Sequence, residues 1–159
     1  MKKETFFYEG TAVSWPRAVK AGNTVYFAVA GVDGLGNVVA PDFEQQLEFM
    51  YKQLQETLDE LGGSMEDILQ MTLYYVDLAG DLEKAPPIRK KYIPDHRMPI
   101  VAAIGVKELA AVGEWPLLVE ATGSAIVSDR FGEKRRKSES GEDSVTFSAP
   151  RVEGLESET

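Results

Sequence analysis

Short runs of apolar residues separated by turn residues fill the first third of the chain, and this pattern predicts strands. Residues 24–31 (TVYFAVAG) are β-branched and aromatic at their start, which favours a strand. Residues 5–8 and 18–21 show the same character more weakly. Residues 33–37 are turn-forming, and Val38-Val39 after them predicts a further short strand. We therefore expect this part of the chain to form a meander or a hairpin.

A helical pattern begins at Asp42 and ends at Leu61. Its apolar residues recur at three- and four-residue steps and form one stripe, made by Phe43, Leu47, Met50, Tyr51, Leu54, Leu58 and Leu61. Residues 68–78 then predict a strand, and residues 81–92 predict a second helix. Because proline fits only the first turn of a helix, its regular part should start at about Pro87.

Two more apolar runs, residues 99–106 and 115–121, predict strands in the second half. Such runs, rich in branched residues and bounded by Gly or Pro, are typical of strands buried on both faces. The second run contains Glu120. A buried carboxylate has to be paired, protonated or placed in a cleft, since desolvating its charge is costly. Glu120 is therefore the first candidate for chemistry, although a glutamate at a strand end can also simply reach solvent.

The order strand, strand, strand, helix, strand, helix, strand, strand predicts an α+β fold. We expect one six-stranded sheet with two helices packed on a single face. The opposite face would then be uncovered while many of its positions are apolar. Because a large exposed apolar face usually marks association, we expect an oligomer.

The composition changes after Val127, which suggests a boundary between two regions. Residues 1–127 carry the strand and helix patterns, whereas residues 128–159 are rich in charge, Ser and Gly and have little to bury. We expect a disordered charged tail there. The basic cluster at residues 134–137 is compatible with an interaction tail or, more simply, with a solvated extension.

Charge and residue counts narrow the classes of partner and chemistry. The formal net charge of −9 argues against general nucleic-acid binding. No apolar stretch approaches the roughly 20 residues of a membrane helix, and no export signal is visible, so we expect a cytoplasmic protein. Without cysteine and with His96 as the single histidine, we expect no disulfide, no thiol nucleophile and no metal site within one chain.

Five sequence segments, in this order and at these spacings, resemble the reactive intermediate deaminase family (Rid, also called YjgF-type). They are residues 18–26 (AVKAGNTVY), 36–39 (GNVV), 67–78 (DILQMTLYYVDL), Pro99 with 104–106 (IGV), and 118–120 (LVE). The resemblance covers residues 14–127. It implies a chorismate-mutase-like homotrimer with sites at the subunit interfaces. These sites would hydrolyse enamines and imines to carbonyl compounds and ammonia without metal or organic cofactor.

The same resemblance implies an arginine that holds the substrate carboxylate and a glutamate that positions water, and here this sequence departs from the family. Val101 falls where the arginine belongs, and valine cannot bind a carboxylate. Trp15 falls on a family aromatic residue. Residues 28–31 cover a Ser-Gly pair and lack the serine. Glu120 matches the glutamate if about three residues are inserted within 107–115; the other register would place Leu118 there.

We therefore expect an unusually apolar pocket in which Glu120 is catalytic. The substrate-binding candidates are Trp15, Val29, Ala30, Gly31 and Val101. Arg17 and Arg97 are candidates to replace the lost cation, although salt bridging at the surface is the commoner role of such residues. The first reading is a divergent Rid enzyme acting on an enamine or imine. The alternative is a non-catalytic trimeric homologue that binds a small molecule or regulates. A third reading is a partner protein that acts through its tail.

Overall fold

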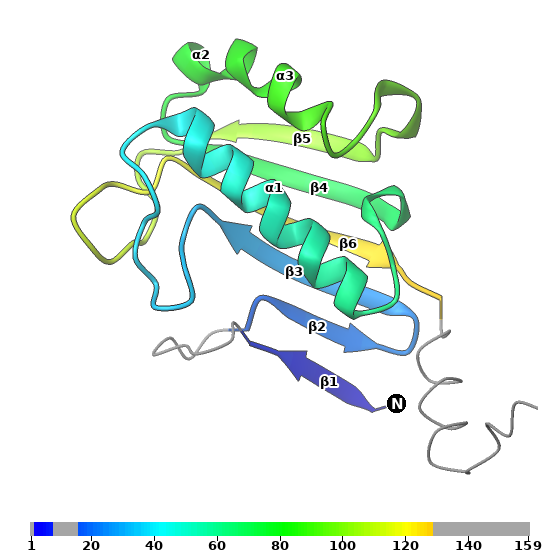
Figure 1. Ribbon diagram of the computed structural model, residues 1–159. Coiled ribbons are helices and arrows are strands. Elements are labelled where there is room, and N and C mark those ends of the chain that lie inside the picture. The colour runs from blue at the N-terminus through cyan, green and yellow to red at the C-terminus, as the bar shows by residue number, and fades with distance from the viewer. Residues whose placement is uncertain (1, 8–15, 129–159) are drawn as a thin grey trace, which may run out of the picture. The chain divides into compact units, whose positions relative to one another are not determined.

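A single six-stranded sheet forms the centre of the protein, in the order β1-β2-β3-β6-β4-β5 (Figure 1). The computed structural model describes residues 2–7 and 16–128. The strands are β1 (Lys3–Phe6), β2 (Ala18–Ala21), β3 (Thr24–Ala30), β4 (Ile68–Tyr75), β5 (Ile100–Gly105) and β6 (Val119–Ile126). All neighbours pair antiparallel except β4 and β5, which are parallel. The expected α+β class with one six-stranded sheet is confirmed.

The main helix α1 (Phe43–Glu60) lies across one face of this sheet, as its apolar stripe predicts. The Asp42 side chain accepts a hydrogen bond from the Gln45 backbone N–H at 3.0 Å, which satisfies one of the free donors in the first turn. Gly62, with φ 81°, adopts the left-handed conformation that ends the helix. The buried stripe residues form the main core together with the facing sides of β3, β4 and β6.

The second helical region is broken into short pieces, in contrast to the single helix expected over residues 81–92. It consists of α2 (Leu78–Asp81), a 3-10 turn (Leu82–Lys84) and α3 (Ala85–Arg89). The Asp77 carboxylate accepts from the Gly80 backbone N–H at 3.0 Å and starts the first piece. Two prolines occupy the first turn of α3, since they lack the N–H that an interior position needs. Two further 3-10 turns, Met65–Asp67 and Asp95–Arg97, precede β4 and β5.

Three strand expectations need correction. Val38-Val39 forms no strand, only an isolated bridge between Val32 and Val38. The last strand begins at Val119 instead of 115, because Pro116 lacks a donor and the Leu118 N–H binds a side chain rather than a neighbouring strand. Strand β5 is exposed along its whole length rather than buried on both faces, since it is an edge strand with one neighbour.

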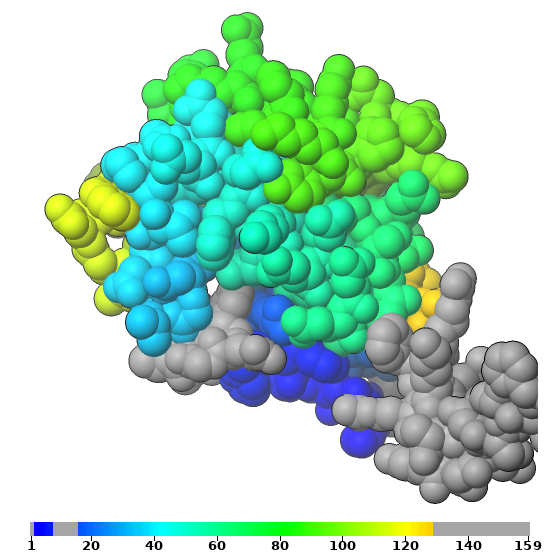
Figure 2. Space-filling view, in the orientation of Figure 1, coloured from blue at the N-terminus to red at the C-terminus, as the bar shows by residue number. Residues whose placement is uncertain are grey.

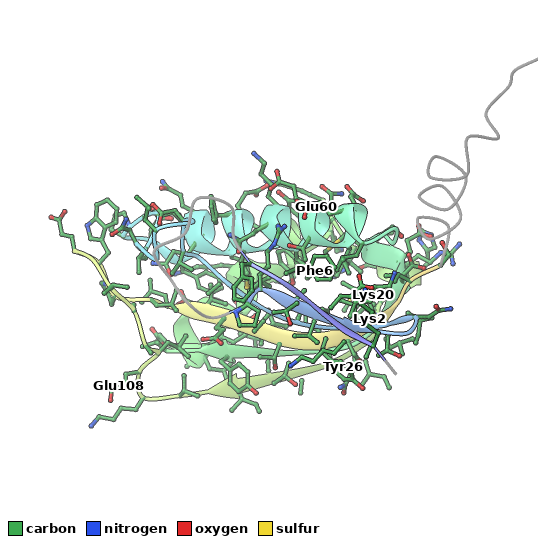
Figure 3. All side chains as sticks on the ribbon, turned by 90° about the horizontal axis from the view of Figure 1, so that it is seen from below. Lys2, Phe6, Lys20, Tyr26, Glu60 and Glu108 are labelled. Atoms are coloured by element: carbon green, nitrogen blue, oxygen red, sulfur yellow. The ribbon has the colours of Figure 1, made fainter. Side chains whose placement is uncertain are left out.

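The face of the sheet opposite α1, called here the open face, carries no helix formed by residues 2–7 or 16–128. Figure 2 views the other side, which α1 and the pieces around α3 cover. Residues directly opposite each other on paired strands share a face, so Tyr26, Ile100 and Ile104 all lie on the open face, with exposed fractions of 57%, 78% and 44%. Figure 3 shows Tyr26 on the side of the sheet away from α1. The apolar character of this face agrees with the expectation from the sequence.

The chain separates after Asp129 into two units, of which the first contains all the described residues. The tail expected over residues 128–159 therefore lies outside them except for Ser128, whose Oγ donates to the Gly62 carbonyl at 3.3 Å. Among residues 2–7 and 16–128, no helix is long and apolar enough to cross a membrane.

Gly31 allows α1 to approach the end of β3, and this contact gives a stability prediction. A Cβ at Gly31 would lie 2.7 Å from Gln46 Cβ. Gly31→Ala should therefore lower the free energy of unfolding by about 1–3 kcal/mol, the usual cost of overpacking. Urea denaturation would measure the loss. Gly105→Ala is the matched control, because its Cβ would lie 3.4 Å from Leu78 Cβ, an ordinary contact. Equal stability of the Gly31→Ala protein and the unchanged chain would contradict the prediction.

Candidate functional site

A cleft of about 470 Å³ lies where β3 ends and β6 begins. Its walls come from the end of β3, the turn after it, and the loop that joins β5 to β6. The lining residues are almost all small and apolar: Pro16, Ala28, Val29, Ala30, Val32, Gly36, Ala110, Ala111, Val112, Leu117 and Glu120. Glu120 is the one titratable group among these described lining residues. The volume falls in the range of small-molecule sites, about 300–1,000 Å³.

Glu120 reaches the cleft because of its position in the pleat of β6. Its neighbours Val119 and Ala121 are fully buried in the main core, so the side chain between them points to the open face. The residue opposite it on β3 is Ala30, and the one on β4 is Tyr74. Ala30 is too small to shield or hydrogen-bond the carboxyl, and leaves room for a ligand beside it.

The carboxyl of Glu120 is half-buried and has no hydrogen-bond or ion-pair partner among residues 2–7 and 16–128. Burial raises its pKa, because the apolar walls disfavour the charged form. No cation of the described lining opposes this effect. A carboxyl in this setting holds its proton at a higher pH than a solvated glutamate does.

The side chain of Gln46 on α1 fixes the strand end that carries Glu120. Its Nε2 donates to the carbonyls of Ala40 (2.8 Å) and Pro116 (3.0 Å). Its Oε1 accepts from the Leu118 backbone N–H at 2.8 Å. The residue is completely buried. These three hydrogen bonds, called here the Gln46 bridge, hold the residues just before β6 against α1, two positions from Glu120.

The far wall of the cleft is held by contacts between two loops. The Val38 backbone N–H donates to the Val112 carbonyl at 3.4 Å, and Asn37 pairs with Val112 in an isolated bridge. A small second core lies beside this contact and contains Ala30, Val32, Val38 and Leu117, with Leu109 packed on it. These contacts attach the Val112 part of the wall to the turn after β3.

The structure brings together three of the residues singled out from the sequence, Glu120, Val29 and Ala30. Gly31 is buried next to them, but its described role is the close contact with Gln46. Leu118, the residue of the alternative register, packs against the main core and does not line the cleft.

Val101 lies away from this group. Glu120 is level with Tyr74 and Ile104 across the sheet, whereas Val101 is level with Met71. The offset is three residues along β5, or about 10 Å. Met71 belongs to the core, so Val101 faces the α1 side of the sheet, opposite to the side that Glu120 faces. Val101 is 38% exposed and does not line the described cleft.

The two candidate arginines also lie outside the described cleft. Arg17 is buried against α1, where Nη1 donates to Thr57 Oγ1 at 3.2 Å and Nη2 pairs with the Glu60 carboxylate. Figure 3 shows Glu60 on the α1 side of the sheet. Arg97 is an exposed residue whose Nε lies 3.8 Å from Glu66 Oε2. Trp15 lies outside the described residues.

Several lining residues carried no signal in the sequence. Ala110, Ala111, Val112 and Leu117 belong to the irregular connection between β5 and β6, which has no periodicity to reveal which side faces inward. The one hint was the insertion within residues 107–115, since a lengthened loop beside a strand end often forms part of a site. Among the described residues, no group of three or more His, Asp or Glu is placed to hold a metal ion.

Comparisons with known proteins agree with the fold and its motifs. The sequence model of a family described as Endoribonuclease L-PSP matches residues 9–127. A RutC family protein from Pyrococcus abyssi is 28% identical over 116 residues, which cover 69% of this chain and 88% of that protein. The chain therefore belongs to the Endoribonuclease L-PSP family, also known as the YjgF or Rid family.

Solved structures show the same fold at low sequence identity. RidA from the Antarctic bacterium Psychrobacter sp. PAMC 21119 aligns with a TM-score of 0.64 at 22% identity, covering 78% of this chain and 97% of RidA. A YjgF/YER057c/UK114 family member from Mycobacterium tuberculosis aligns with a TM-score of 0.64 at 21% identity, covering 79% and 100% of the two chains. The family resemblance read from the sequence is confirmed.

The burial of Glu120 predicts a pH-dependent effect on stability. The pKa of Glu120 is higher in the folded chain than in the unfolded chain, so the folded state binds more protons between the two values and loses stability as pH rises through them. Glu120→Gln removes this ionisation. The variant should have a higher melting temperature than the unchanged chain above neutral pH. The difference should shrink as pH falls through the raised pKa of folded Glu120 and should be gone below the ordinary value of about 4.5.

Thermal unfolding followed by circular dichroism at several pH values would measure this difference. Glu108→Gln is the matched control because it makes the same charge change at an exposed residue outside the cleft. A Glu120→Gln protein that is less stable than the unchanged chain at high pH would show that the fold stabilises the Glu120 carboxylate, which would contradict the prediction.

Proposed function

We propose that this protein hydrolyses the C=N bond of a small imine, or of the enamine in equilibrium with it, in the Glu120 cleft. The overall reaction adds one water to the C=N bond and yields a carbonyl compound and ammonia. The observation that carries the proposal is the half-buried carboxyl without a partner in an apolar cleft. Such a group is suited to proton transfer, because its pKa is higher, and so nearer to 7, than the pKa of a solvated glutamate.

Each proton in the proposed reaction passes through Glu120. The neutral carboxyl first donates its proton to the imine nitrogen, which makes the carbon electrophilic. The resulting carboxylate then accepts a proton from the water that attacks this carbon, giving a carbinolamine. Protonation of the amine by the same carboxyl and loss of the hydroxyl proton release ammonia and form the carbonyl group. Glu120 ends in the state in which it began, so the sequence of steps is balanced.

Cleavage of RNA, which the family description suggests, has less support. A nuclease has to hold a polyanion, usually with a basic surface. The chain carries a formal net charge of −9, and the described lining of the cleft contains no lysine or arginine. A second candidate is a non-catalytic protein that binds a small molecule in the same cleft. It is favoured by the presence of one polar side chain in the described lining, since family catalysis was expected to use several groups.

We further propose that the protein acts as a homotrimer in the cytoplasm, with a small molecule as its ligand. The apolar open face supports association, because monomeric proteins rarely expose large apolar patches. Tyr26 on β3 and Ile100 and Ile104 on β5 provide exposed apolar side chains on this face. The absence of any cysteine in the sequence is compatible with a reducing compartment.

Removal of the Glu120 carboxyl tests the enzymatic proposal. Glu120→Ala should lower kcat/KM for imine hydrolysis by about 10²–10⁴, the usual contribution of a general acid–base group. Ammonia release from imines generated in the assay measures the rate, and Glu108→Gln should keep full activity. Turnover that is unaffected by Glu120→Ala would exclude Glu120 as the proton-transfer group. Tight ligand binding without turnover of any imine would favour the non-catalytic protein.

A charge placed on the open face tests the assembly. Ile100→Glu should dissociate the trimer, because a carboxylate buried between subunits is strongly disfavoured. Light scattering should give three chain masses for the unchanged protein and a lower mass for the variant. Leu35→Glu, at an exposed leucine of the turn after β3, serves as control and should leave the mass unchanged. A monomeric unchanged chain would contradict the proposed trimer.

A further inference from the structure

The charge of the cleft separates two classes of nitrogen compound, those with a carboxylate and those without. A site for an imino acid needs a cation that pairs with the ligand carboxylate, typically an arginine. The described lining offers no cation and one carboxyl, Glu120. The charged residues of the loop that follows β5, namely Lys107, Glu108 and Glu114, are exposed and are not among the lining residues.

Arg17, which is next to a lining residue in sequence, and Arg97, which precedes β5, both bind residues outside the cleft. Arg17 follows the lining residue Pro16, but its guanidinium contacts Thr57 and Glu60 on the opposite side of the sheet. Breaking these contacts would leave the Glu60 carboxylate without its partner. Arg97 pairs with Glu66 beside the other end of β5. Neither can turn into the cleft without losing its present partner.

The shape of the cleft determines the rest of the ligand. Ala28, Ala30, Ala110 and Ala111 leave an open space bordered by Val32 and Leu117, with no hydroxyl or amide side chain in the described lining. A short aliphatic group can fill this space and bury apolar surface, at roughly 25 cal/mol per Å². A ligand carboxylate placed there would lose its hydration without a partner and would also be repelled by ionised Glu120.

We propose that the Glu120 cleft selects small cationic nitrogen compounds with a short aliphatic chain, that is, alkylammonium ions and protonated imines of simple aliphatic aldehydes and ketones, and rejects their carboxylate counterparts. This inference rests on the proposed function for its imine substrates, and it concerns recognition rather than turnover. The nitrogen of the ligand lies at Glu120, the one acceptor side chain of the described lining. The aliphatic chain of the ligand lies along the four lining alanines. A bound cation would favour the ionised form of Glu120 and would therefore lower the pKa that burial raises in the empty cleft.

Binding of unreactive probes tests the selection without any turnover. Butylamine and butyrate have the same chain length and opposite charge, and at about pH 8 both are ionised. Isothermal titration calorimetry on the full chain should show butylammonium binding on the order of tenfold or more tighter than butyrate. Glu120→Gln, which keeps the shape of the side chain, should bring the two affinities to within about twofold, whereas Glu108→Gln should leave the ratio unchanged.

The outcomes separate this inference from the proposed function. Tighter binding of butyrate than of butylammonium, or no binding of either, would overturn the selection of cations even if imines are hydrolysed. A preference for butylammonium that survives Glu120→Gln would overturn the assignment of Glu120 as the recognition group. A Glu120-dependent preference in a protein that hydrolyses no imine would support the selection and contradict the enzymatic proposal.

Discussion

The Gln46 bridge is the interaction on which the geometry of the site depends. A fully buried amide is costly unless its donors and acceptor are paired. Here Gln46 meets this condition with hydrogen bonds to residues from two distant parts of the chain, Ala40 and the segment Pro116–Leu118. The Gln46 bridge holds the segment Pro116–Leu118 against α1, and therefore fixes where β6 begins. It also needs the close approach of α1 to the sheet that Gly31 allows.

The start of β6 in turn determines the environment of Glu120. Side chains alternate along a strand, so a shift of one residue would move Glu120 into the core and Val119 onto the open face. With the observed register, the carboxyl lies between small apolar walls and in reach of a ligand. The described lining holds no other charged residue that could offset the effect of burial, so the pKa of Glu120 stays raised. The Gln46 bridge thus positions the strand end that carries Glu120.

The parts of this fold that follow from periodic patterns could be predicted from the sequence. The stripe from Phe43 to Leu58 identified α1, and the branched and aromatic run at residues 24–30 identified β3. Glu120 drew attention because one carboxylate interrupts an apolar run. Only the structure shows that Glu120 lies in a cleft, because the sequence equally allowed a glutamate that reaches solvent at a strand end. The family motifs, read together, indicated the correct fold.

Features that depend on contacts between distant segments could not be predicted. The wall from Ala110 to Val112 lies in an irregular loop, where no period shows which side chains face inward. Gln46 looked like any polar residue of a helix, since its partners lie 70 and 72 positions away in the chain. The exposure of β5 follows from its place at the sheet edge, which composition does not reveal. The sequence did not indicate that Arg17 faces α1, because the contacts of Arg17 depend on how the helix crosses the sheet.

A titration of the Glu120 carboxyl tests most directly whether the cleft around it is apolar and free of cations. Nuclear magnetic resonance of the full chain, with carbon-13 in the glutamate side chains, follows each carboxyl as the pH changes, and Glu120→Gln assigns the signal. The pKa of Glu120 should lie clearly above the ordinary value of 4.5, because the apolar cleft disfavours its charge. A pKa at or below that value would show that a cation or a set of hydrogen bonds stabilises the carboxylate. The apolar, cation-free cleft described here would then be contradicted.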